Sequence, residues 1–247
     1  MCSTIFVWAT IVCFIECVAG LALPDFIKPC SRDDPKLNEC ALQSARESIG
    51  RYALGDPSRN LKPLDPLYVP LMTVYVPNEQ GLKLQFIDNN FTGLANMELL
   101  NLKFNLDKKI ITTDALVNLS VQAKYDLSGK ILIVPVDSNG DASIKLKNTT
   151  LHFKMWYEHK TCEDGEIHWN IIKHDVKYEV GKGIFRLENI LNDKNIGDQI
   201  NKLLNELWRE IVADVGPTIS EAMCVAVIEN LQALLHQVPY DLLMPPS

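Results

Sequence analysis

Apolar and polar residues alternate through the middle of the chain and predict β-strands. Residues 100–107 and 119–127 each carry their apolar side chains at a spacing of two, which places those side chains on one face. Residues 73–88 have the pattern of a β-hairpin. Residues 130–136 are apolar on both faces, and we expect a turn at the following Asn139-Gly140.

The longest alternating segment changes parity part-way along. The residues expected to face inward are Ala142, Ile144, Leu146, Leu151, Phe153, Met155 and Tyr157. One extra residue between Asn148 and Thr150, a β-bulge, would keep all of them on one face, bend the sheet and turn Asn148 outward. A second long strand, residues 165–180, would pair back on this one. Strands of this length predict a strongly curved antiparallel sheet.

Helical spacing begins and ends the chain. We expect a first helix after an Asp34 N-cap and Pro35. In the final third, residues 200–238 carry a wide apolar stripe, interrupted by Gly216-Pro217, where we expect a kink. About 38 helical residues would extend about 57 Å. No second helix of that length can cover the stripe, so we predict an α+β fold in which the sheet wraps a long C-terminal helix.

The N-terminus has the features of an export signal. Residues 5–15 form an apolar run too short to span a bilayer, and Val18 and Gly20 suit a cleavage site. The alternative, a buried helix, lacks an amphipathic pattern. We therefore expect a signal peptide at residues 1–20, a single domain at residues 21–247, and a secreted, extracellular protein.

Glycosylation signals and charge agree with export. Three sequons begin at Asn90, Asn118 and Asn148. The net charge is −7 and there is no basic patch, so nucleic acids and anionic membrane surfaces are poor partners. Beyond the signal peptide we expect no integral membrane segment.

The cysteines suit an oxidising compartment. Cys30 and Cys40 bracket a short charged loop, and a disulfide between them is the simplest interpretation. For Cys162 and Cys224 two interpretations stay open: a second disulfide, or a buried free thiol at Cys224. The even number of cysteines beyond residue 20 makes us favour the bridge.

The sequence lacks the motifs of common enzymes and metal sites. It contains no GxSxG, P-loop, HExxH or GxGxxG motif. His168 and His174 would lie about 20 Å apart on one strand, so they cannot share a metal ion. We expect no enzyme activity, no cofactor and no metal.

Six segments together resemble a known family. They are residues 29–40, 61–70, 86–94, 125–148, 187–217 and 238–245. In this order they resemble the insect haemolymph juvenile hormone binding proteins, most closely the takeout-like branch. The resemblance implies a long C-terminal helix inside a highly curved antiparallel sheet and an apolar tunnel between them. It also implies a carrier of juvenile hormone, another terpenoid or a fatty acid-like lipid, and a disulfide at Cys30–Cys40. We expect a monomer.

Side chains that could contact such a ligand fall into two kinds. The first kind has an apolar body and one polar group: Tyr125, Tyr157 and Trp169. The second kind would line apolar walls: Phe153, Met155, Phe185 and Met223. For each, the alternative is an ordinary core residue that does not touch ligand.

Three functions are consistent with these features. The first is a secreted carrier of a small hydrophobic ligand. The second is a secreted regulator of the same fold, with its tunnel filled by side chains, that acts through a protein partner. The third, a hydrolase of the hormone or of a lipid ester, has no nucleophile motif to support it.

Overall fold

The protein is described here by a computed structural model that places residues 22–75, 83–131 and 134–247. The expected signal peptide and the turn of the hairpin at residues 73–88 lie outside these ranges. The two arms of that hairpin are present and pair antiparallel, as predicted.

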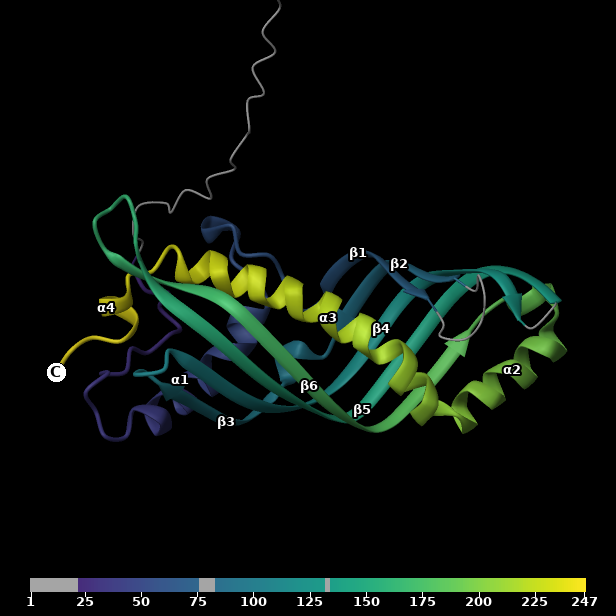
Figure 1. Ribbon diagram of the computed structural model, residues 1–247, viewed down its shortest axis with the longest axis horizontal. Helices are drawn as coiled ribbons and strands as arrows, with labels where there is room; N and C mark the ends of the chain where they lie inside the picture. Colours follow the sequence, from purple (N-terminus) through teal and green to yellow (C-terminus); the bar gives the residue numbers. More distant parts are fainter. Residues whose placement is uncertain (1–21, 76–82, 132–133) are drawn as a thin grey trace, which may run out of the picture.

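The described strands form one six-stranded antiparallel sheet in the order β1-β2-β4-β5-β6, with β3 also paired to β4. Their bounds are β1 Leu67–Tyr75, β2 Lys83–Thr92, β3 Glu98–Asn105, β4 Ile110–Ile131, β5 Val134–Thr161 and β6 Ile167–Leu187. The three longest strands, β4, β5 and β6, run along most of the molecule, and the sheet curls around its long axis (Figure 1).

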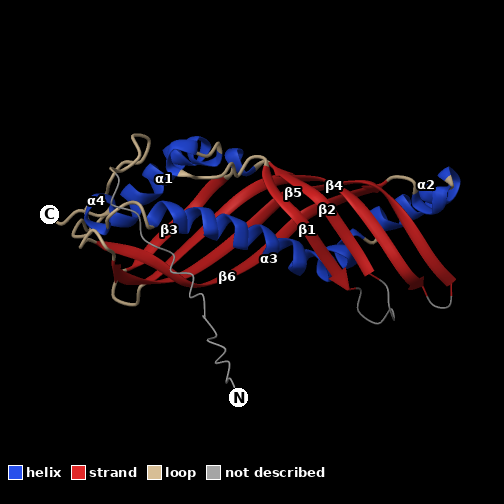
Figure 2. Cartoon of the chain, turned by 90° about the horizontal axis from the view of Figure 1, so that it is seen from above, coloured by secondary structure: helices blue, strands red, loops and turns tan. Residues whose placement is uncertain are grey.

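In the described parts of the chain, four helices accompany the sheet: α1 Leu37–Ala53, α2 Lys194–Glu206, α3 Trp208–Leu235 and α4 Tyr240–Leu243. Short 3₁₀ turns occur at Pro57–Arg59, Leu94–Asn96 and Ile190–Asn192. Helix α3 lies along the open side of the curled sheet and contacts both β6 and β1 (Figure 2). The predicted fold class, a long C-terminal helix wrapped by a curved antiparallel sheet, is confirmed.

The C-terminal helical segment is divided at Leu207, where no break was predicted. The chain leaves helical geometry at Leu207 (φ −94°, ψ 26°), which separates α2 from α3. Helix α3 continues through Gly216 and Pro217. Asp193 caps the start of α2 with two backbone hydrogen bonds, so the helical segment begins earlier than expected.

The predicted bulge in β5 is present. Val117 pairs with Thr149 while Leu119 pairs with Leu146, so the β5 strand has one residue more than β4 at this point. Asn148 has a positive φ of 49° and its side chain is exposed. Leu146 and Thr149 therefore both face the inside of the sheet although their numbers differ in parity.

The turn predicted at Asn139-Gly140 is wrong, because these residues lie within β5 opposite Asp126 and Tyr125. A side chain on residue 140 would clash with neighbouring atoms, so only glycine fits at this position. A Cβ at this position would lie 2.3 Å from the backbone oxygen of Glu188 and 3.2 Å from Cε1 of Tyr125.

One end of the molecule is closed by the segment around Cys30 together with the C-terminal residues. Cys30 and Cys40 form the predicted disulfide, and Cys30 is buried. The backbone N–H of Cys30 donates to the carbonyl of Leu243, and that of Arg32 donates to the carbonyl of Pro245. The disulfide therefore fixes the N-terminal segment on α1 beside α4.

Within the described ranges, α3 is the one helix whose length and composition would also let it cross a membrane. In this fold its Ile219 and Met223 belong to the main apolar core, together with the concave face of the sheet. We interpret its apolar composition as that of a core helix.

The close packing at Gly140 leads to a stability prediction. We expect Gly140→Ala to lose about 1–3 kcal/mol, because the added methyl meets backbone that cannot move alone. The matched control is Gly50→Ala in α1, where the nearest atom is 3.8 Å away. There we expect a gain of about 0.5–1 kcal/mol from better helix propensity. Urea unfolding of both variants measures the difference, and equal effects would contradict the placement of Gly140.

The disulfide leads to a second prediction. Closing a loop of this length stabilises the fold by about 2.7 kcal/mol in the chain-entropy model. We expect Cys30→Ala, Cys40→Ala and the double variant each to lose about this amount, since each removes the same bond. Urea unfolding would contradict a shared bond if the losses of the two single variants added up in the double variant.

Candidate functional site: an apolar cavity between α3 and the sheet

The concave face of the sheet supplies one wall of an internal cavity. The lining residues from the strands are Phe91, Leu119, Val121, Ile144, Leu146, Thr149, Leu151, Tyr178, Val180 and Phe185. They come from the four neighbouring strands β2, β4, β5 and β6. They face inward because side chains alternate along each strand and because the bulge at Asn148 keeps both halves of β5 in step.

Helix α3 supplies the opposite wall. Its lining residues are Ile211, Val212, Val215, Gly216, Ile219, Ser220 and Met223. They recur at helical spacing and so form one stripe along the helix. Together the two walls enclose about 40 Å³. Ligand pockets usually measure about 300–1,000 Å³, so a farnesyl-sized molecule fits here only if the walls separate.

The cavity has no charged lining residue and three polar ones, Thr149, Tyr178 and Ser220. The Ser220 hydroxyl donates to the carbonyl of Pro217 at 3.1 Å. The Tyr178 hydroxyl donates to the carbonyl of Val212 at 3.4 Å, which is long for such a bond. Burial raises the pKa of Tyr178, so this hydroxyl stays neutral.

Gly216 lets the ring of Tyr178 lie against α3. A Cβ on residue 216 would sit 2.4 Å from the Tyr178 hydroxyl oxygen. A surface hollow of about 700 Å³ lies between residues 172–178 of β6 and Pro217, Ser220 and Glu221 of α3. Tyr178 and Ser220 line both the surface hollow and the internal cavity, so they mark where the two approach each other.

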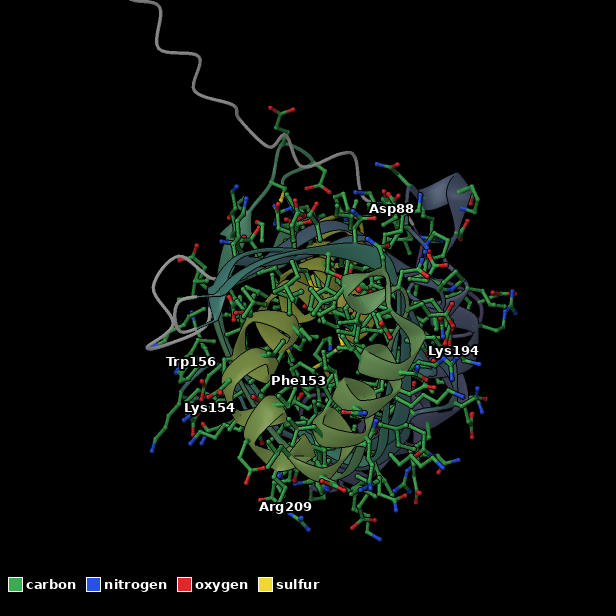
Figure 3. The ribbon with its side chains drawn as sticks, turned by 90° about the vertical axis from the view of Figure 1, so that its right-hand side faces the viewer. Asp88, Phe153, Lys154, Trp156, Lys194 and Arg209 are labelled. Carbon is green, nitrogen blue, oxygen red and sulfur yellow. A yellow bond between two sulfur atoms is a disulfide. The ribbon has the colours of Figure 1, made fainter. Side chains whose placement is uncertain are left out.

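Two of the seven side chains expected at a ligand site, Phe185 and Met223, line this cavity. Phe153 is half-buried and points into the curled sheet, whereas Lys154 and Trp156 point outward (Figure 3). Phe153 does not line the cavity, but it packs against the same core cluster.

Met155, Tyr157 and Trp169 lie in a separate cluster at the end closed by the disulfide. The Tyr157 and Trp169 ring centroids are 4.6 Å apart, and Tyr240 of α4 lies 5.5 Å from Trp169. Burial, with the neighbouring Tyr240, raises the pKa of Tyr157 to about 12. The structure therefore does not bring these three residues together with Phe185 and Met223.

Tyr125 is fully buried, and its hydroxyl forms hydrogen bonds with other groups of the protein. The hydroxyl donates to the carbonyl of Glu188 at 2.8 Å and shares a hydrogen bond of 3.1 Å with the Ser138 hydroxyl. These contacts join β4, β5 and the segment after β6. Tyr125 does not line the cavity, so its polar group has a structural use.

Thr149, Tyr178 and Gly216 were missed as site residues, although signals for two of them exist. Val176, Tyr178 and Val180 alternate with charged residues, which places Tyr178 on the inner face. The predicted bulge likewise turns Thr149 inward. The contact that requires Gly216 joins α3 to β6, and a single sequence does not show which residues face each other there.

The favoured bridge between Cys162 and Cys224 is wrong. Cys224 is a free, buried thiol, whose pKa burial raises to about 11, so it is not bridged to Cys162. His168, just beyond the turn that carries Cys162, bonds the carbonyl of Leu235 through Nδ1 at 3.2 Å. Leu235 lies about 16 Å along α3 from Cys224, whereas a disulfide needs Cα atoms within about 7 Å.

The sequon residues lie on the outer surface near the bulge. Asn118 and Asn148 are exposed, and the backbone N–H of Asn148 donates to Oδ1 of Asn118 at 2.8 Å. Asn90 is half-buried, and its side-chain amide donates to the carbonyl of Asp88.

Among the residues that the structure places, no group of three or more His, Cys, Asp or Glu side chains could hold a metal ion.

Comparison with known proteins agrees with this architecture. The sequence matches the haemolymph juvenile hormone binding protein (JHBP) family over residues 8–245. It is 31% identical over 253 residues to the circadian clock-controlled protein daywake of Drosophila melanogaster, across 97% of this chain and 95% of that protein. It is 22% identical over 149 residues to the juvenile hormone-binding protein of Manduca sexta, across 55% of this chain and 64% of that protein.

A solved structure shares the fold. The crystal structure of Epiphyas postvittana Takeout 1 matches with a TM-score of 0.78 and 25% sequence identity, covering 86% of this chain and 97% of that chain. The family match spans nearly the whole sequence and includes both walls of the cavity. The chain therefore belongs to the haemolymph juvenile hormone binding protein family, within its takeout-like branch.

Proposed function

We propose that the protein is a secreted carrier of a small hydrophobic ligand, held between α3 and the concave face of the sheet. The observation that carries this proposal is the internal cavity, whose lining is apolar apart from three uncharged polar side chains. Juvenile hormone, another terpenoid or a lipid suits such a lining. The name of the Manduca sexta relative supports a ligand of this class.

The energetics favour apolar cargo. Removing apolar surface from water yields about 25 cal/mol per Å². A farnesyl-sized molecule that buries some 400 Å² would gain on the order of 10 kcal/mol before the entropy losses of binding. No charged group of the cavity lining would have to lose its hydration in the process.

Ligand uptake requires α3 to move away from the sheet, and the contacts of the helix allow this in its middle. On the N-terminal side of α3, the Asn205 side chain of the preceding helix α2 bonds both the N–H and the carbonyl of Phe185. At the other end, the Gln232 side chain bonds the N–H of Ile171 and the carbonyl of Trp169. These amide contacts fix the ends of the helical segment against β6.

Between these anchors the contacts to β6 are weaker. They include the 3.4 Å bond from Tyr178 to Val212 and a 3.5 Å ion pair of His174 with Glu221, whose carboxylate is mostly exposed. Exposed ion pairs contribute little to stability. We propose that the middle of α3 is the moving wall.

Export is part of the proposal. The buried Cys30–Cys40 disulfide suits an oxidising compartment. The exposed Asn118 and Asn148 are accessible for glycosylation, and we propose Asn90 as a third site. We further propose a signal peptide at residues 1–20, a single domain at residues 21–247, a monomer, and a function without catalysis, cofactor, metal or nucleic acid.

A second candidate function follows from the small volume of the cavity. If the walls do not separate, about 40 Å³ holds no ligand of the proposed size. The protein would then be a secreted regulator whose interior is filled by side chains and which acts through a protein partner.

The two candidates are separated by blocking the cavity. We expect Met223→Trp to weaken binding of farnesyl acetate at least about tenfold, because the larger ring occupies the space between the walls. Displacement of N-phenyl-1-naphthylamine fluorescence measures the affinity. The matched control is Val225→Trp, at an exposed position of the same helix, where we expect a change below about twofold.

Thermal unfolding of both variants establishes that they fold. Binding by Met223→Trp that equals wild-type binding would contradict the cavity as the site. Native mass spectrometry of the secreted wild-type protein gives an independent reading. A protein that carries no apolar adduct and takes up no farnesyl acetate would favour the regulator.

A further inference from the structure

One polar atom in the cavity has no protein partner. Thr149 is 1% exposed, and its hydroxyl oxygen makes no hydrogen bond. Leaving a buried hydroxyl unpaired costs free energy, and buried polar groups in folded proteins are almost always paired. The fold does not need a hydroxyl here, because valine has the same shape and a similar preference for strands.

The unpaired hydroxyl belongs to a residue of the proposed ligand site. Thr149 lines the cavity between the sheet and α3. On β5 and β6, Leu151 pairs with Tyr178 and Thr149 pairs with Val180, so Thr149 and Tyr178 are diagonal neighbours on the inner face. Such neighbours have Cα atoms about 7–8 Å apart. The Tyr178 hydroxyl, with its long bond to Val212, is a second under-used donor in the lining.

The surroundings restrict what can meet these hydroxyls. The lining contains no Lys, Arg or His, so a buried carboxylate would find no cation to pair with. A hydroxyl of threonine can donate or accept. A neutral oxygen attached to an apolar chain, as in a carbonyl, an ester or an alcohol, satisfies it without placing a charge in the cavity.

We infer that Thr149 selects the ligand of this site: a neutral apolar molecule whose oxygen function bonds the Thr149 hydroxyl, with Tyr178 as a second donor. This rests on the carrier function proposed above and adds the chemical class of the cargo. Hydrocarbons lack the oxygen, and fatty acid anions bring a charge that the lining does not neutralise.

The test uses four molecules with the same fifteen-carbon chain: farnesene, farnesol, farnesal and farnesoic acid. Each displaces N-phenyl-1-naphthylamine from wild-type protein, Thr149→Val and Thr149→Ser at neutral pH. For wild type we expect farnesal or farnesol to bind about 5–10-fold more tightly than farnesene. This ratio of affinities corresponds to the net free energy of one hydrogen bond. Farnesoic acid should bind more weakly than the neutral oxygenated pair.

The variants separate a role in selection from a role in the fold. Thr149→Val should lose the preference for oxygen while keeping its affinity for farnesene, and Thr149→Ser should retain the preference. The unpaired hydroxyl destabilises the ligand-free fold. Thr149→Val should therefore also raise the midpoint of thermal unfolding of the ligand-free protein by about 2–4 °C.

Two outcomes overturn the inference in distinguishable ways. If wild type and Thr149→Val prefer the oxygenated ligands equally, Thr149 does not select the ligand and the carrier function stands. If wild type binds none of the four molecules, the carrier function falls and this inference falls with it.

Discussion

The structure depends on the burial of one sheet face by one helix. Strands β4, β5 and β6 together present a long inner surface of apolar side chains that water would otherwise cover. Exposing a continuous apolar face of that size to water is unfavourable. The sheet is therefore curled, and α3 covers the gap between its β6 and β1 edges (Figure 2). The curvature, the position of the helix and the enclosed cavity all follow from this constraint.

The polar contacts determine where the helix can yield. Side-chain amides fix α2 and the C-terminal part of α3 to β6, through Asn205 at Phe185 and Gln232 at Ile171. Asn230 adds a pair of bonds to the N–H and carbonyl of Lys62. Between these positions the interface is mostly apolar, and apolar contacts are not directional. The movement proposed for the middle of α3 would therefore break no strong hydrogen bond.

Much of this architecture could be predicted from the sequence because alternation is a local property. The change of parity around Asn148 predicted the bulge, and the bulge explains how Leu146 and Thr149 share a face. The cavity residues were harder to predict. Alternation places Met155, Tyr157 and Trp169 on the inside, but it does not show which helix covers them, and they lie beside α4 instead of the middle of α3.

Other errors have similar causes. Asn139-Gly140 has the composition of a turn, yet Gly140 leaves room for the backbone oxygen of Glu188 and the ring of Tyr125. That contact joins two strands, and a single sequence shows only neighbours along the chain. The expected Cys162–Cys224 bridge failed for the same reason, because cysteine count does not determine distance along α3.

A small cavity is compatible with a carrier for an energetic reason. Empty volume in a protein core costs about 24 cal/mol per Å³, so a permanent tunnel of about 300 Å³ would cost about 7 kcal/mol. That is comparable with the whole stability of a typical domain, about 5–15 kcal/mol. A carrier avoids this cost if its helix settles onto the sheet when no ligand is held, and about 40 Å³ remains here. The ligand then replaces the contacts that α3 gives up, and affinity depends on how much better the ligand fills the space than the helix does.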